Sequence, residues 1–201
     1  MTIVRILPLL LLMGMAMPME LACAAGVDRN DHATSSTTEM HITSVELTAR
    51  PMLYVSETTP MTEMPALMNT AFATLGQFLK SAGVTPIGPP MAVFHAWSGD
   101  STAVDIGFPV TAADARKASG SVLGGMSPGG FALKVVHVGP YVDFPATYAA
   151  IQTAMRDAGI ADSTRMWEVY LGQPGITPDA ELVTEIYMQV TSAEAAKFPA
   201  E

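Results

Sequence analysis

Two stretches of the chain carry apolar residues at every third or fourth position, residues 70–84 (TAFATLGQFLKSAGV) and 146–160 (ATYAAIQTAMRDAGI). This spacing places the apolar side chains on one face of an α-helix, so both stretches are predicted to be amphipathic helices. Gly83 and Gly159 stand near their ends, where a helix C-cap favours glycine. Each helix is therefore expected to bury one face against the rest of the domain.

Short apolar runs with the length of β-strands flank the two predicted helices. In the first half of the chain they are residues 50–57, 90–96 and 104–110, and in the second half residues 131–140, 166–172 and 184–190. Each half is therefore predicted to contain a strand, a helix and two further strands, in that order.

The two halves are related by an internal repeat with an offset of 76 residues. Phe72 of the first helix matches Tyr148 of the second, and after a four-residue insertion Asp105 matches Glu185 in the last strand of each half. Two such β-α-β-β units predict an α+β fold. We expect an antiparallel-rich sheet with the two main helices on one side and a cleft between the pseudo-symmetric halves.

One predicted strand, residues 167–171 (WEVYL), contains a carboxylate in an otherwise apolar and aromatic run. Because strand side chains alternate between faces, Glu168 and Tyr170 share one face and Trp167 belongs to the other. A carboxylate that is buried without partners is costly, so either this face is solvated or Glu168 binds something. Glu168 matches Ala92 in the repeat and so occurs in the second half only. A residue that breaks the internal symmetry is the better candidate for function.

The N-terminal residues 1–24 have the layout of a secretory signal peptide, with one positive charge, a short apolar run and the small residues Ala22 and Ala24 before the expected cleavage site. The apolar run is short for a spanning helix, so no stable membrane span is expected in the mature chain. We expect a periplasmic or secreted protein. A lipid anchor on Cys23 is not favoured, because Glu20 occupies the position where a lipobox needs leucine.

The rest of the chain divides into three segments. Residues 25–41 are polar and are predicted to be a flexible linker, residues 42–190 form one domain, and residues 191–201 form a C-terminal tail. Hydrophobic residues make up 49 % of the chain, which is enough for a core that holds this domain without disulfides.

Charge and motifs exclude several functions. The formal net charge is −9 and the chain has no basic stripe, so nucleic acid is not expected as a partner. The chain has no cysteine pair, no HxxxH motif and no carboxylate–histidine cluster, so no metal site and no cofactor is predicted. No GxSxG nucleophile motif is present either.

Six stretches occur in order along the predicted domain: 85–94 (TPIGPPMAVF), 105–110 (DIGFPV), 129–141 (GGFALKVVHVGPY), 147–151 (TYAAI), 167–171 (WEVYL) and 181–190 (ELVTEIYMQV). Together they resemble the GyrI-like small-molecule-binding family, also described as the effector-binding domain behind AraC-type and MerR-type DNA-binding domains. The resemblance implies a duplicated fold whose cleft takes amphipathic, often cationic, aromatic compounds, with Glu168 facing the ligand. The linker is too short for a DNA-binding domain, so a transcriptional regulator is not expected.

The leading hypothesis is an exported protein that holds a small amphipathic molecule in the cleft between its two halves, with cationic aromatic compounds among the candidates. Glu168 would supply the charge, and Tyr170, Trp167, Tyr187 and Glu185 would supply further contacts. On a straight strand Trp167 belongs to the core, so a bulge would be needed to turn it toward the ligand. The alternative for Glu185 is a solvated strand residue. The oligomeric state is left open.

Two alternatives from other classes are considered. A hydrolase of this family would use Glu168 as a general base, with a pKa raised by a dry pocket. A haem binder is suggested by the similar fold of SOUL-type proteins, with His95 or His137 as axial ligands. Tyr141 and Tyr148 are expected to serve ordinary packing.

Overall fold

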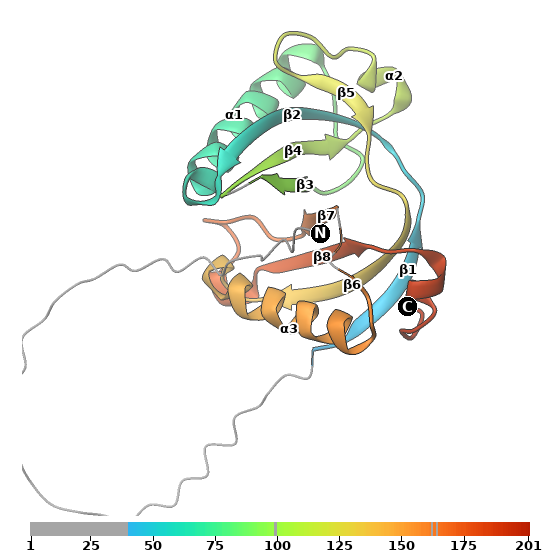
Figure 1. Cartoon of the computed structure of the whole chain (residues 1–201). Coiled ribbons are helices and arrows are strands. Elements are labelled where there is room, and N and C mark those ends of the chain that lie inside the picture. The colour runs from blue at the N-terminus through green and yellow to red at the C-terminus, as the bar shows by residue number, and fades with distance from the viewer. Residues whose placement is uncertain (1–39, 99, 162, 164) are drawn as a thin grey trace, which may run out of the picture.

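The computed structural model describes residues 40–98, 100–161, 163 and 165–201 (Figure 1). The predicted signal peptide and all but the last two residues of the predicted linker lie outside the described residues. The elements are β1 (Ile42–Leu47), β2 (Pro51–Pro60), η1 (Met61–Glu63), α1 (Met64–Ala82), β3 (Met91–Ser98), β4 (Ser101–Pro109), α2 (Ala112–Ala115), β5 (Leu123–Met126), β6 (Gly130–Val138), η2 (Tyr141–Asp143), α3 (Phe144–Asp157), β7 (Met166–Tyr170), η3 (Asp179–Glu181), β8 (Val183–Gln189) and α4 (Ser192–Ala195).

The strands of the described chain form one antiparallel sheet in the order β1-β6-β8-β7-β3-β4-β2-β5. The two halves of the repeat meet in the middle, where β3 pairs with β7. At the ends the halves exchange strands, because β1 pairs with β6 of the second half and β5 pairs with β2 of the first. This exchange connects each half to the other at two separate places in the sheet.

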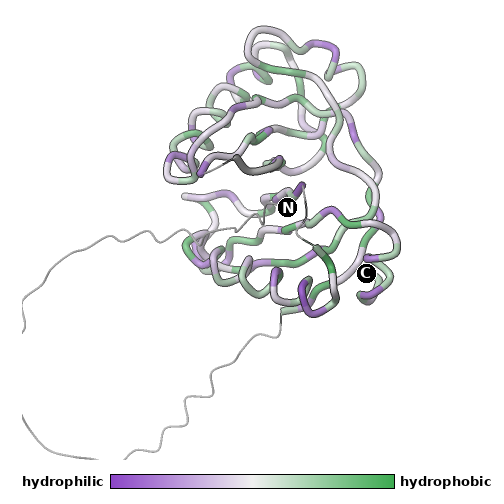
Figure 2. The backbone as a smooth tube through the Cα atoms, in the orientation of Figure 1, coloured by the Kyte–Doolittle hydropathy of each residue, from purple (hydrophilic) through white to green (hydrophobic). Residues whose placement is uncertain are grey.

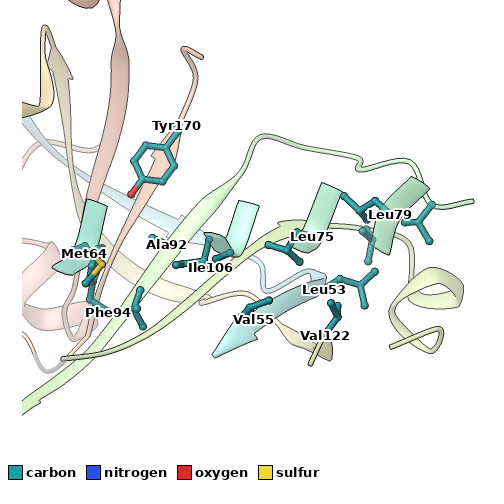
Figure 3. Packing of buried hydrophobic residues seen from close by; sticks show 14 residues of the cluster. Leu53, Val55, Met64, Leu75, Leu79, Ala92, Phe94, Ile106, Val122 and Tyr170 are labelled. Atoms are coloured by element: carbon teal, nitrogen blue, oxygen red, sulfur yellow. The ribbon is translucent and has the colours of Figure 1, made fainter. Parts of the chain in front are cut away.

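The helices α1 and α3 pack on the same face of the sheet, one in each half (Figure 1). Leu75 of α1 packs in a buried cluster with Leu53 of β2, as Figure 3 shows. Ile151 of α3 matches Leu75 in the repeat and packs with Ile186 of β8. The predicted α+β fold with two main helices on one side is therefore confirmed. None of the described helices is long and apolar enough to cross a membrane.

The opposite face of the sheet carries a second apolar cluster, which includes Met52, Val93 and Trp167. The chain is hydrophobic along strands of both halves, as the green segments of Figure 2 show. Both faces of the sheet are therefore apolar, as a fully buried central strand requires.

The two connections β1–β2 and β5–β6 contact each other. The N–H of Arg50 donates to Oγ of Ser127 at 2.9 Å, and the N–H of Ser127 donates to the carbonyl of Arg50 at 2.7 Å.

The C-terminal residues after β8 fold back on the domain. Phe198 packs against the apolar cluster beneath α3. The N–H of Ser44 in β1 donates to the carbonyl of Pro199 at 2.7 Å, and the N–H of Glu201 donates to the carbonyl of Ser44 at 3.1 Å. The end of the chain thus covers the open edge of β1, which would otherwise expose unpaired backbone groups.

Replacing Phe198 by alanine is expected to lower the free energy of unfolding by about 1–2 kcal/mol, because the half-buried ring loses its apolar contacts. Urea denaturation followed by circular dichroism measures this loss. The control is Ile176→Ala at a side chain that is 74 % exposed, where the change should stay within about 0.5 kcal/mol. Equal effects of the two substitutions would show that the C-terminal residues do not stabilise the domain.

Candidate functional site

Glu168 lies on β7, next to the junction between the two halves. Its cross-strand neighbours are Ala92 on β3 and Ile186 on β8. The residue is only 4 % exposed. The hydroxyl of Tyr148 on α3 donates a hydrogen bond to Oε1, and the hydroxyl of Tyr170 donates to Oε2 at 2.6 Å. Each carboxylate oxygen therefore has one hydroxyl partner, which lowers the cost of burial but supplies no positive charge.

All three members of this cluster differ from their partners in the repeat. Tyr148 matches Phe72 and Tyr170 matches Phe94 at the same offset of 76 residues that relates Glu168 to Ala92. Ala92 is also the residue directly across the β3–β7 pair, so the pseudo-twofold axis of the domain passes beside Glu168. At these three positions the second half carries two rings with hydroxyls and a carboxylate, whereas the first half carries two rings without hydroxyls and a methyl group.

Burial controls the titration of the cluster. Burial raises the pKa of Glu168 above its ordinary value of 4.5, and the hydrogen bonds from Tyr148 and Tyr170 oppose this rise. The pKa values of Tyr148 and Tyr170 are raised well above 10.0, first by burial and then by the neighbouring carboxylate. Both tyrosines are therefore neutral donors at physiological pH.

Aromatic rings from both halves pack against the two tyrosines that bind the carboxylate. The ring of Tyr170 lies 6.4 Å from Phe72 of α1 and 5.9 Å from Tyr141, and the ring of Tyr148 lies 6.0 Å from Phe144. Apart from Tyr170, these rings are only half-buried. They provide apolar, half-buried ring surfaces next to the tyrosines that bind Glu168, and an aromatic ligand could stack on them.

Thr184 adds an unusual polar group on this face of the sheet. It pairs with Tyr170 across β7 and β8, is 0 % exposed, and its Oγ1 makes no hydrogen bond to the described residues. Burial and then the charge of Glu168 raise the pKa of Tyr141. The hydroxyl of Thr184 opposes this rise, although it does not meet the geometry of a hydrogen bond. A buried hydroxyl without a partner is uncommon in folded proteins.

The structure separates the residues predicted to bind a ligand into two groups. Glu168 and Tyr170 share the helix-covered face, as strand alternation predicted. Trp167 and Tyr187 stack on the opposite face, with ring centroids 5.2 Å apart and an interplanar angle of 7°. Glu185 lies beside them and accepts a hydrogen bond from the Tyr187 hydroxyl at 2.8 Å. That Trp167, Tyr187 and Glu185 bind a ligand stays a prediction. Such a ligand would lie on the face of the sheet opposite Glu168.

Lys134 explains how Glu185 is accommodated on that second face. Its Nζ lies 2.9 Å from Oε1 of Glu185 and 2.5 Å from Oε1 of Glu201. Glu185 therefore has a cationic partner, whereas no Lys, Arg or His nitrogen of the described residues lies within 4.0 Å of the Glu168 carboxylate. The two acids differ in what compensates their charge.

Sequence reasoning missed the part played by Tyr148, which was expected to serve ordinary packing. The repeat held the signal, because Tyr148 differs from Phe72 only by its hydroxyl and that hydroxyl is the group that meets Glu168. Tyr141 was likewise expected to pack, and it lies against Tyr170 beside the cluster. No local pattern could show which residues converge on Glu168, since Tyr148 reaches it from α3.

The two histidines considered as haem ligands have partners within the domain. His137 is 6 % exposed, and its Nδ1 lies 2.8 Å from Oγ1 of Thr147. His95 Nε2 lies 2.8 Å from Oδ2 of Asp105. Among the residues that the structure describes, no three His, Cys, Asp or Glu side chains converge as a metal site would require.

Comparison with known proteins identifies the class of protein. A family model for the GyrI-like small molecule binding domain matches residues 40–191. The chain therefore belongs to this family, as its sequence motifs indicated. No curated protein matches the chain.

Solved structures agree on the fold. The C-terminal domain of EcmrR is 20 % identical with a TM-score of 0.63, and the match covers 75 % of this chain and 96 % of that domain. SAV2435, solved bound to tetraphenylphosphonium, is 14 % identical with a TM-score of 0.57, and the match covers 77 % of this chain and 96 % of that one. An uncharacterised conserved protein from Listeria innocua is 15 % identical with a TM-score of 0.54, covering 75 % of this chain and 92 % of that one. At these identities the likeness concerns the fold.

Proposed function

We propose that the protein binds a small amphipathic cation with aromatic groups, and that Glu168 supplies the charge that the cation meets. The observation that carries this proposal is a buried carboxylate whose partners among the described residues are the neutral hydroxyls of Tyr148 and Tyr170. Its negative charge is solvated by hydrogen bonds but is not neutralised. A ligand cation placed beside it would be attracted strongly in a site of low dielectric constant.

The surroundings support an aromatic ligand. Half-buried rings such as Phe72 and Tyr141 offer faces and edges for stacking and for cation–π contacts. Family membership supports a small-molecule ligand in general. The tetraphenylphosphonium complex of SAV2435 supports a lipophilic aromatic cation in particular, because that protein shares the fold. The raised pKa of Glu168 would suit a general base as well, but no further observation favours hydrolysis.

The place of action is proposed from the N-terminal sequence alone. Residues 1–24 have the pattern of an export signal, which supports a protein that acts in the periplasm or outside the cell. Such a protein would meet its ligand outside the cytoplasm.

Tetraphenylphosphonium is expected to raise the melting temperature of the protein. At about 100 times the dissociation constant, a ligand that binds only the folded state stabilises it by about 2.7 kcal/mol. Differential scanning fluorimetry measures the shift. Tetraphenylborate, which has nearly the same shape and the opposite charge, is the control and should produce no comparable shift. Equal stabilisation by the two ions would show that the site recognises apolar surface and not charge.

The affinity for tetraphenylphosphonium should fall as the pH is lowered from neutral toward 4.5. The cation favours ionised Glu168, whose pKa burial raises above 4.5, so acidification through that pKa neutralises the carboxylate and removes the attraction. The ligand keeps its charge at every pH, and the neighbouring tyrosines stay neutral because their pKa values are raised above 10.0. Calorimetric titration at several pH values tests this, and an affinity independent of pH would argue against Glu168 as the charged group.

A further inference from the structure

A separate cavity of about 100 Å³ opens on the sheet face opposite Glu168. Its lining includes Met52 of β2 and Val93 of β3, which are 2 % and 3 % exposed and belong to the apolar cluster of that face. Ala92 pairs with Glu168 and shares its face of the sheet. Because strand side chains alternate between faces, its neighbour Val93 lies on the opposite face. The sheet therefore separates this cavity from the candidate site described above.

The remaining apolar lining comes from β2, from the end of β5 and from the connection between β5 and β6. Tyr54 of β2 and Pro128 form part of the wall, and Met126 at the end of β5 contributes a side chain that is 59 % exposed. A single water takes up about 30 Å³ in the liquid, so the cavity has room for a few waters or for a molecule of a few non-hydrogen atoms. The proposed aromatic cation is too large for it.

Three charged or titratable side chains line the same cavity. His95 of β3 and Asp105 of β4 are joined through Nε2 and Oδ2 at 2.8 Å. Arg165 stands directly before β7, the strand that pairs with β3. The site thus combines a carboxylate that already has a partner with a guanidinium group.

Arg165 carries the charge that a ligand would meet. Within the described residues it has no carboxylate oxygen within 4.0 Å, although the chain has a formal net charge of −9. Asp105 is engaged by His95 and is not the partner of Arg165. Arginine presents a planar set of donors that binds carboxylates in a two-point contact. A half-buried arginine in the wall of this cavity, which has both polar and apolar lining residues, is thus suited to the anionic end of a small amphipathic molecule.

We propose that this cavity is a second ligand site, which takes a short-chain monocarboxylate with its carboxylate on Arg165 and its alkyl chain against Met52 and Val93. The His95–Asp105 pair limits the site to one anionic group, because a second would meet the carboxylate of Asp105. This proposal does not depend on the function proposed for Glu168, since the two sites lie on opposite faces of the sheet.

The test uses the protein labelled with ¹³C at its methionine methyl groups and titrated with sodium butyrate, followed by NMR. The Met52 and Met126 methyl signals should shift in a saturable manner with a dissociation constant on the order of 1 mM, the range expected for a ligand of this size. Butyramide and butylammonium, which keep the chain but not the negative charge, are expected to bind at least about tenfold more weakly. Absence of saturable shifts, or equal binding of either comparison compound, would overturn the proposal.

Matched variants identify the charged partner. Arg165→Gln should weaken butyrate binding about tenfold or more, and Arg165→Lys, which keeps the charge but loses the planar donors, should give an intermediate loss. Arg116→Gln, at an exposed arginine, should leave butyrate binding unchanged. Unchanged binding in folded Arg165→Gln would overturn the proposal. Tetraphenylphosphonium binding measured on the same variant should equal that of the wild type, so failure of this site and failure of the Glu168 site are distinguishable.

Discussion

Replacing Glu168 by glutamine is expected to weaken tetraphenylphosphonium binding by about 30-fold or more, equivalent to about 2 kcal/mol, as is typical when one charged partner of a buried pair is removed. The substitution keeps the shape of the side chain and removes its charge. Isothermal titration calorimetry at neutral pH measures the change. In the same experiment, the variant should lose the fall in affinity on acidification, because the group that titrates is gone.

Two further Glu→Gln substitutions make this result specific. Glu57→Gln, at an exposed position on β2, is the control and should leave the affinity unchanged. Glu185→Gln tests the sequence-based prediction that Glu185 also binds the ligand, since this residue lies on the other face beside Tyr187. If Glu168→Gln binds as tightly as the wild type, the carboxylate belongs to the scaffold and the proposed function loses its main support.

The stability of the ligand-free protein gives an independent check on the same substitution. Because burial raises the pKa of Glu168, the carboxyl group contributes most favourably below its unfolded pKa, and this contribution is lost as the pH rises through the folded pKa. The free energy of unfolding of the wild type should therefore fall relative to that of Glu168→Gln as the pH rises from below 4.5 to neutral. A variant that loses binding without losing stability would show that the effect on the ligand is direct.

Replacing Tyr170 by phenylalanine is expected to lower the free energy of unfolding at neutral pH by about 1.5–3 kcal/mol, the range for hydrogen bonds to charged groups. The 2.6 Å bond from its hydroxyl supplies one of the two donors to a buried carboxylate, and the phenyl ring cannot replace it. Urea denaturation at neutral pH measures the loss. The pKa of Glu168 should rise further in this variant, because the bond from Tyr170 opposes the effect of burial.

A double-mutant cycle separates this bond from packing. In the Glu168→Gln background the loss from Tyr170→Phe should be smaller, because the acceptor is neutral, and the difference is the coupling between the two side chains. The comparison variant is Tyr187→Phe, whose hydroxyl bonds a carboxylate that already has Lys134 as a partner. Identical losses from Tyr170→Phe in both backgrounds would show that the hydroxyl acts independently of the charge on Glu168.

Short-range patterns along the chain predicted most of the elements of the fold. The 3.6-residue period predicted α1 and α3, and a two-residue period predicted that Glu168 and Tyr170 share a face, because both periods follow from local backbone geometry. Strands β1 and β5 were not predicted. Strand β5 has only four residues, and both strands pair with the opposite half of the chain, so nothing in the neighbouring residues indicates where they belong.

The repeat of 76 residues was the strongest signal for the site, because it distinguishes Glu168 from Ala92 by residue identity alone. The same alignment contained the Tyr148–Phe72 difference, but a hydroxyl on a helix face has many possible partners. Only the antiparallel pairing of β3 with β7 places Ala92 across from Glu168, and only the packing of α3 brings the hydroxyl of Tyr148 to its carboxylate.

By itself the sequence determined the repeated β-α-β-β order, the family and the carboxylate that breaks the symmetry, since these depend on residue identity and spacing along the chain. The tertiary structure alone decided which side chains meet that carboxylate and that Trp167, Tyr187 and Glu185 gather on the other face. It also brought His95 and Asp105 to one cavity with Arg165. Such contacts join residues on different strands and helices, and they are set by strand pairing and helix packing across the whole domain, which local periodicity does not encode.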